Sequence, residues 1–156
     1  MSAVSINQIF YKIKSKWILT EASLQIEQGS IYALCGPSGC GKTTICQTIL
    51  GAKRIYSGTV KLFQNESEIQ IPGKDCGYMP QSVSLHDYMT GEECLNFYGL
   101  INGMKISEIN KQIEMLSQLL QIKDRLKSRV TKWSGGQQRR LSLACTLIHN
   151  PKLLIL

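Results

Sequence analysis

The distribution of apolar and polar residues predicts that the chain begins with β-structure. Apolar and β-branched residues are mixed over Val4–Ile13, and polar and apolar positions alternate over Ser23–Glu27, as is typical of strands with one buried face. The continuous apolar run Ile31–Cys35 instead favours a parallel strand that is buried on both faces. Ser57–Phe63 and Cys76–Pro80 also predict strands, the second of which ends at its proline.

Four segments carry apolar residues at helical spacing. They are Lys42–Leu50, which Gly51 closes, then Glu92–Ile101, Ser107–Leu120, and Gly135–His149, which ends before Asn150 and Pro151. We expect a last buried strand at Leu153–Leu156, and a polar hairpin tip at Asn65–Glu68 from which the chain returns over Ile69–Ile71. This order predicts a mixed α/β core with a helical subdomain inserted into it.

Size and composition fit one folded domain. The chain has 156 residues, of which 43% are hydrophobic, and this excludes general disorder. No run approaches the ~18–20 uninterrupted apolar residues that a membrane span needs, and we find no secretory signal. The six cysteines form neither a CxxC pair nor a cluster with zinc spacing, so we expect free thiols.

The formal net charge is +7, and basic residues are concentrated between Lys123 and Arg140. A patch of this kind is compatible with nucleic acid, but no aromatic stacking platform or recognised nucleic-acid module accompanies it. A solvated helical face, or a surface near anionic lipid headgroups, explains the charge more simply. We therefore expect no nucleic-acid partner.

The first segment that carries chemistry is a phosphate loop of the Walker A type. It reads Gly36, Pro37, Ser38, Gly39, Cys40, Gly41, Lys42 and Thr43. The glycines let successive backbone N–H groups turn toward phosphate oxygens, and the following helix presents the positive end of its dipole. Lys42 is expected to reach the β- and γ-phosphates of ATP, Thr43 to ligate Mg²⁺, and Thr44 to add a second hydroxyl. The alternative is a glycine-rich turn that only joins a strand to a helix.

A second and rarer segment, Ser134-Gly135-Gly136-Gln137, begins the last predicted helix. It satisfies a capping box, with Ser134 as N-cap and Gln137 at N3, so a well-capped helix is one interpretation. Two adjacent glycines argue for more, because glycine weakens a first helical turn unless something approaches the backbone closely. Glycine N–H groups and a serine hydroxyl at a helix N-terminus form an anion site. The expected ligand is the γ-phosphate of an ATP molecule held by the phosphate loop of a second copy.

Together the two segments resemble the ATP-binding domain of ABC transporters. The run Ser30–Leu34, taken with Ser134–Arg140, is most similar to the eukaryotic G- and H-type subfamilies. Gly77–Gln81 is similar to the Q-loop of that family, and Leu141–Leu156 is similar to its run from signature helix into the Walker B strand. The resemblance implies an α/β P-loop NTPase core with an N-terminal antiparallel β region and a helical subdomain. It further implies that Gln81 contacts Mg²⁺ or the attacking water, and that Tyr11 stacks on adenine, with Phe10 as its rival.

The resemblance also implies an organisation and a setting. Residues 1–86 would form the β region and Walker A core, 87–134 the helical subdomain ending in the signature motif, and 135–156 the signature helix and Walker B strand. Two such domains would enclose two ATP molecules head to tail and hydrolyse them to ADP and phosphate. A transmembrane domain of the same or a partner chain would place them at the cytoplasmic face of a membrane.

The chain stops at Leu156, where the family would next place its Mg²⁺-binding and catalytic acids. We therefore expect an N-terminal fragment that lacks the C-terminal part of the fold and hydrolyses ATP poorly on its own. Two alternatives stay open. One is a soluble ABC-type ATPase that acts on ribosomes or DNA, and the other is a truncated ATP-binding module without hydrolysis. The family usually has leucine where this chain has Trp133.

Overall fold

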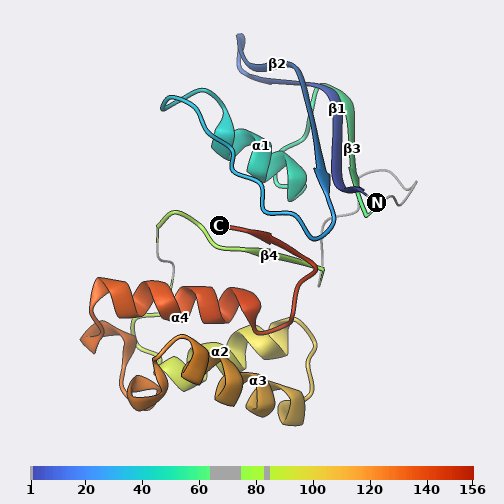
Figure 1. Cartoon of the computed structure of the whole chain (residues 1–156). Coiled ribbons are helices and arrows are strands. Elements are labelled where there is room, and N and C mark those ends of the chain that lie inside the picture. Colours follow the sequence, from blue (N-terminus) through green and yellow to red (C-terminus); the bar gives the residue numbers. More distant parts are fainter. Residues whose placement is uncertain (1, 64–74, 83–84) are drawn as a thin grey trace. The chain divides into compact units, whose positions relative to one another are not determined.

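The computed structural model of the chain describes residues 2–63, 75–82 and 85–156 (Figure 1). It consists of two compact units, Met1–Gly73 and Lys74–Leu156. The hairpin tip expected at Asn65–Glu68 and the returning segment Ile69–Ile71 lie outside the described residues.

A three-stranded antiparallel sheet forms the first unit, in the order β2-β1-β3. Its strands are β1 (Ser2–Ile13), β2 (Lys16–Glu27) and β3 (Ser57–Leu62), which confirms the predicted strands in this region. The buried residues of β1 are Ser2, Ala3, Val4, Ile6 and Ile9, of which Val4 and Ile9 are fully buried. The sheet therefore turns one apolar face inward, as its sequence pattern indicates.

Helix α1 (Lys42–Ile49) accompanies this sheet in the first unit, as predicted (Figure 1). It ends at Gly51, whose φ of 66° is left-handed. The Gly51 N–H donates to Thr48 O at 3.0 Å and the Ala52 N–H donates to Gln47 O at 2.9 Å. These two bonds make a Schellman motif, which explains why glycine closes the helix.

The prediction of a buried parallel strand at Ile31–Cys35 is wrong. The segment is irregular, and Ile31 and Tyr32 are 103% and 51% exposed. An apolar run becomes a strand only when a neighbouring strand accepts its backbone hydrogen bonds. Within the described part of the first unit, the ladder joins β1 to β2 and β3 and offers this run no partner.

The second unit contains a parallel pair of short strands, β4 (Cys76–Tyr78) and β5 (Leu153–Ile155). Its helices are α2 (Gly91–Ile101), α3 (Ile106–Leu119) and α4 (Gly135–Leu147), with the short 3₁₀ turns η1 (Lys123–Arg125) and η2 (Val130–Lys132). All three α-helices were predicted. The strand β5 was also predicted, but it is only half-buried, because β4 is its one partner among the described residues.

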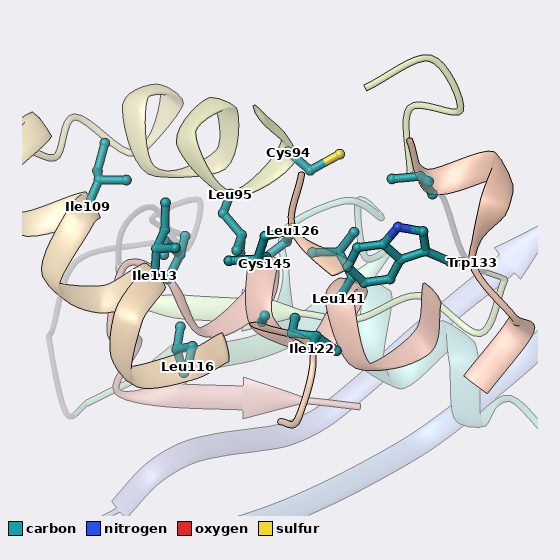
Figure 2. Close-up of a cluster of buried hydrophobic side chains, with 13 residues drawn as sticks. Cys94, Leu95, Ile109, Ile113, Leu116, Ile122, Leu126, Trp133, Leu141 and Cys145 are labelled. Atoms are coloured by element: carbon teal, nitrogen blue, oxygen red, sulfur yellow. The ribbon is translucent and has the colours of Figure 1, made fainter. Parts of the chain in front are cut away.

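One hydrophobic cluster holds the helices of the second unit together (Figure 2). Its buried members are Cys94, Leu95, Ile109, Ile113, Leu116, Ile122, Leu126, Val130, Trp133, Leu141, Ala144, Cys145 and Ile148. The helical spacing of these residues in α2, α3 and α4 brings one face of each helix to the cluster. No helix in the described residues is both long and apolar enough to cross a membrane.

Candidate functional site

The phosphate loop, Gly36–Thr43, is exposed along most of its length and gathers around the side chain of Lys42. The Lys42 ammonium donates hydrogen bonds to Gly36 O at 2.7 Å and to Pro37 O at 2.8 Å. Cys40 Sγ lies 3.8 Å from the same nitrogen. The one cation of the loop is thus held over its own backbone, at the place where an anion would replace carbonyl oxygens as its partner.

The loop ends in a helix N-terminus that has no side-chain cap. Gly41 is the N-cap of α1 with a φ of 101°, and no side chain bonds the first turn. A helix leaves its first N–H groups without intrahelical partners, and they attract negative charge. Gly39 also has a left-handed φ, 79°, and a Cβ there would meet nothing within 4 Å. The open loop and the uncapped turn together make a site suited to phosphate.

Two threonines follow Lys42 in the first turn of α1. Thr43 is exposed, whereas Thr44 is half-buried and its carbonyl accepts a hydrogen bond from Thr48 Oγ1 at 2.7 Å. An exposed hydroxyl in this turn is a hard oxygen donor of the kind that Mg²⁺ prefers, and Mg²⁺ usually takes its other ligands from phosphates and water. The residues present therefore fit the magnesium of a Mg²⁺–ATP complex.

Tyr11 lies in β1 directly opposite Leu19 of β2. Opposite residues of an antiparallel pair present their side chains on the same face. Leu19 Cδ2 packs against Gly41, where an added Cβ would lie 2.8 Å away. Tyr11 therefore shares a face of the sheet with Leu19, the residue that contacts the N-cap of α1. The rival Phe10 is engaged elsewhere, because its ring packs edge-on against Trp17 with centroids 5.8 Å apart.

The signature segment, Ser134–Gln137, forms the predicted capping box at the start of α4. The Gln137 N–H donates to Ser134 Oγ at 3.3 Å, and the Ser134 N–H donates to Gln137 Oε1 at 2.9 Å. Helix α2 begins with the same arrangement, in which Thr90 is the N-cap and Glu93 the reciprocal partner. A capping box alone therefore does not distinguish the signature segment.

The two glycines of the signature segment do distinguish it. Gly135 and Gly136 are exposed, and a Cβ at either position would meet nothing within 4 Å. Gly77 differs, because a Cβ there would lie 2.9 Å from Thr146 O. Packing inside the described chain thus explains the glycine at 77 but not the pair in the signature segment. A pair of glycines that the fold does not need is best explained by close approach of something outside it.

Gln81 follows β4 in the second unit and is exposed. Arg139 Nη1 donates to Gln81 O at 3.4 Å, which joins the start of α4 to the Q-loop backbone. The structure thus brings Gln81 close to the signature helix within this unit. Arg139 was expected only as part of the basic segment between Lys123 and Arg140, and nothing in the sequence indicated its bond to Gln81.

Two neighbours of Arg139 make similar contacts. Gln138 Nε2 donates to the carbonyls of Val130 and Trp133, both at 3.2 Å, and Arg140 Nη1 donates to Leu120 O at 3.3 Å. With Gln137 and Arg139, four consecutive side chains each hold a different stretch of backbone. The first turns of α4 therefore form a polar junction that sequence reasoning did not identify.

The cysteines and the potential metal ligands are further candidates for a site, besides the phosphate loop and the signature segment. All six cysteines are free, as predicted, with Cys35 and Cys40 exposed and Cys76, Cys94 and Cys145 buried. Burial raises the pKa of the Cys76 thiol to about 11 and also raises the pKa of Cys94 and Cys145. In the described residues no group of three histidine, cysteine or acidic side chains is placed to hold a metal ion by itself.

The chain is similar to proteins of a known family. A family model described as ABC transporter matches residues 19–156. ABC transporter G family member 23 of Dictyostelium discoideum is 39% identical over 98% of this chain and 22% of its own length. G family member 20 of the same organism is 35% identical over 99% of this chain and 21% of its own length. The chain therefore spans about a fifth of the length of these two curated relatives.

Solved structures agree on the fold. The structure of an ATP binding subunit of an ABC transporter superposes with a TM-score of 0.86 and 20% identity, over 97% of this chain and 64% of that one. A structure of cbiO1 from Clostridium perfringens, part of the ABC transporter complex cbiONQ, superposes with a TM-score of 0.85 and 20% identity. The match covers 98% of this chain and 64% of that one. The predicted α/β P-loop fold of the ABC ATPase type is confirmed.

Proposed function

Because the chain belongs to the ABC transporter family, we propose that it is the ATP-binding portion of a transporter that couples ATP binding and hydrolysis to movement of a substrate across a membrane. The family binds ATP and generally requires Mg²⁺. The observation that carries the proposal is the phosphate loop, where Lys42 lies over its own backbone carbonyls beside the uncapped first turn of α1. This arrangement offers a cation and free N–H groups to one anion.

The residues of the loop divide the work of holding Mg²⁺–ATP. Lys42 exchanges the Gly36 and Pro37 carbonyls for β- and γ-phosphate oxygens, and the N–H groups of Gly39, Gly41 and Lys42 bond the remaining oxygens. Thr43 would hold Mg²⁺, which neutralises phosphate charge when bound, and Gln81 would take the role of the Q-loop glutamine. Gly36, Pro37, Ser38 and Cys40 shape the loop, Thr44 adds a hydroxyl, and Tyr11 stacks on adenine.

The signature segment receives the ATP of a second copy. Ser134 and the N–H groups of Gly135 and Gly136 face the γ-phosphate, and Gln137 holds the serine in place. Support comes from the open space in front of both glycines, since the chain's own packing does not require them. Two ATP-binding domains then associate head to tail, and ATP lies between each phosphate loop and the partner's signature segment.

The three parts of the chain take separate tasks in this proposal. Residues 1–86 bind the nucleotide, 87–134 form the helical subdomain ahead of the signature helix, and 135–156 carry the signature helix and the Walker B strand. A transmembrane domain is the second partner and holds the assembly at the cytoplasmic face of a membrane.

The test of the proposed function is a binding titration with a fluorescent ATP analogue and Mg²⁺. The unchanged chain should bind, and Lys42→Ala should bind at least about 100-fold more weakly, because charged hydrogen bonds to phosphate are lost. Lys111→Ala is the matched control, since Lys111 is an exposed lysine of α3 and lies outside the phosphate loop. Equal affinity of the unchanged chain and Lys42→Ala would reject the loop as the nucleotide site.

A further inference from the structure

Trp133 stands immediately before the signature segment and is buried against Gly91, the first residue of α2. The side chain is 4% exposed. A Cβ on Gly91 would lie 2.7 Å from Trp133 Cζ2 and 2.8 Å from Cη2. The far edge of the indole thus occupies the space that any other residue at position 91 would need. Gly91 and Trp133 form a pair of matched sizes.

The indole also has a polar attachment. Trp133 Nε1 donates to Ser128 Oγ at 2.9 Å and lies 3.2 Å from Ser128 O. The segment around Ser128 is itself bound to the start of α2, since the Glu92 N–H donates to Leu126 O at 3.0 Å and the Val130 N–H donates to Met89 O at 2.9 Å. Trp133 therefore contacts the N-terminus of α2 in two ways, directly through the outer edge of its ring and indirectly through the bond from its ring nitrogen to Ser128.

The main chain of Trp133 is held by the other helix. Its carbonyl accepts a hydrogen bond from Gln138 of α4 at 3.2 Å, and the next residue is the N-cap Ser134. One residue therefore links the start of α2, through its side chain, to the start of α4, through its backbone. A displacement of either helix start must shift Trp133, because close-packed side chains transmit strain.

We propose that Trp133 is a positioning residue for the signature segment, with Gly91 as its required counterpart. It sets where Ser134, Gly135 and Gly136 stand relative to α2 and makes no contact with nucleotide itself. The inference rests on the proposed role of the signature segment in receiving a second copy's ATP. The pair combines a match of sizes at Gly91 with a hydrogen bond to Ser128.

A size exchange tests the proposal. Gly91 has an ordinary helical φ, so Gly91→Ala acts through its contact with the ring rather than through backbone strain. Phenylalanine lacks the outer indole atoms, so Gly91→Ala with Trp133→Phe restores room. Gly99→Ala is the matched control on α2, because a Cβ there would lie 2.6 Å from Ile109 Cγ1 at the other end of the helix.

Two measurements are made at a temperature where circular dichroism shows every variant folded. In nitrogen–proton correlation spectra, Gly91→Ala should displace the amide peaks of Ser134, Gly135 and Gly136, the double variant should return them, and Gly99→Ala should leave them in place. In sedimentation with Mg²⁺–ATP, Gly91→Ala should weaken association about ten-fold, and the double variant should recover it to within about three-fold. The affinity of the single chain for ATP should not change.

The outcomes separate the two proposals. Unmoved signature peaks in Gly91→Ala, or no return of the peaks in the double variant, would overturn the positioning role. If Gly91→Ala fails to fold, Trp133→Ala decides alone, since it removes the whole ring, part of which the double variant keeps, and should displace the same peaks. Absence of ATP-dependent association in the unchanged chain would reject the cross-copy function and leave the positioning role to be decided by the spectra.

Discussion

Leu19 Cδ2 lies so close to Gly41 that a Cβ on the glycine would stand 2.8 Å away. Leu19 is buried in β2, and Gly41 has a φ of 101° where α1 begins. The sheet of the first unit thus fixes the end of the phosphate loop, and the loop needs glycine there for two reasons. One reason is backbone conformation, and the other is the space that Leu19 occupies.

The first prediction contrasts two glycines of the loop. Gly41→Ala should weaken ATP binding by about 2–4 kcal/mol, because left-handed strain adds to a side-chain clash. Gly39→Ala should weaken ATP binding by only about 1–2 kcal/mol, since its left-handed backbone is strained by a side chain but the added Cβ has no neighbour within 4 Å. Calorimetric titration with Mg²⁺–ATP measures both. Leu19→Ala should recover part of the Gly41→Ala loss, and equal effects of the two glycine variants would contradict the role of Leu19.

The second prediction uses the two capping boxes. Ser134→Ala and Thr90→Ala should each lower the free energy of unfolding by about 1 kcal/mol, because each removes an N-cap oxygen. Only Ser134→Ala should also weaken association of two copies in Mg²⁺–ATP, and Ser134→Arg should abolish it while the single chain still binds ATP. Urea unfolding and sedimentation measure the two effects. Equal loss of association in Thr90→Ala would assign Ser134 to helix capping alone.

The third prediction concerns the base. Tyr11→Ala should weaken ATP binding by about 1–3 kcal/mol and leave inorganic triphosphate binding unchanged, because stacking involves only adenine. Tyr11→Phe should keep most of the affinity. Phe10→Ala is the control, since the Phe10 ring packs against Trp17. Competition titrations with both ligands give the comparison, and a larger effect of Phe10→Ala would transfer the stacking role to that residue.

The fourth prediction follows from the buried thiols. The pKa of Cys76 is raised by burial from 9.0 to about 11, so the folded chain keeps a proton that the unfolded chain loses above pH 9.0. The free energy of unfolding should therefore be unaffected by this group below pH 9.0 and should fall as pH rises toward about 11. Urea unfolding across that range measures the fall. Cys76→Ala should reduce the slope, and an unchanged slope would contradict the assignment.

A thiol reagent supplies a simpler check on the same cysteines. Cys35 and Cys40 are exposed and should react first, whereas Cys76, Cys94 and Cys145 should react only on unfolding. Mass analysis of the labelled peptides identifies the order. Mg²⁺–ATP should slow the labelling of Cys40, which lies in the phosphate loop, more than that of Cys35.

Local signals in the sequence predicted much of this fold. The Ser134 and Gln137 spacing predicted the capping box, and Gly51 predicted the end of α1, because both depend on hydrogen bonds within a few residues. The strand predicted at Ile31–Cys35 was wrong, because apolar residues indicate only a preference for burial, whereas a strand also needs a partner strand from elsewhere in the sequence. The pairing of Gly91 with Trp133 could not be predicted either, since 42 positions separate the two residues and only the folded chain brings them together.

The polar junction at the start of α4 changes how substitutions in this region should be interpreted. Gln137, Gln138, Arg139 and Arg140 each hold a different backbone segment, so none can be altered without releasing a neighbour. A variant that loses function at Arg139 therefore does not identify a ligand contact, because the same change frees the Q-loop carbonyl of Gln81. Loss of function at any of these four positions therefore first indicates a disturbed local backbone. Only variants that keep the backbone hydrogen bond can show whether the side chain also contacts a ligand.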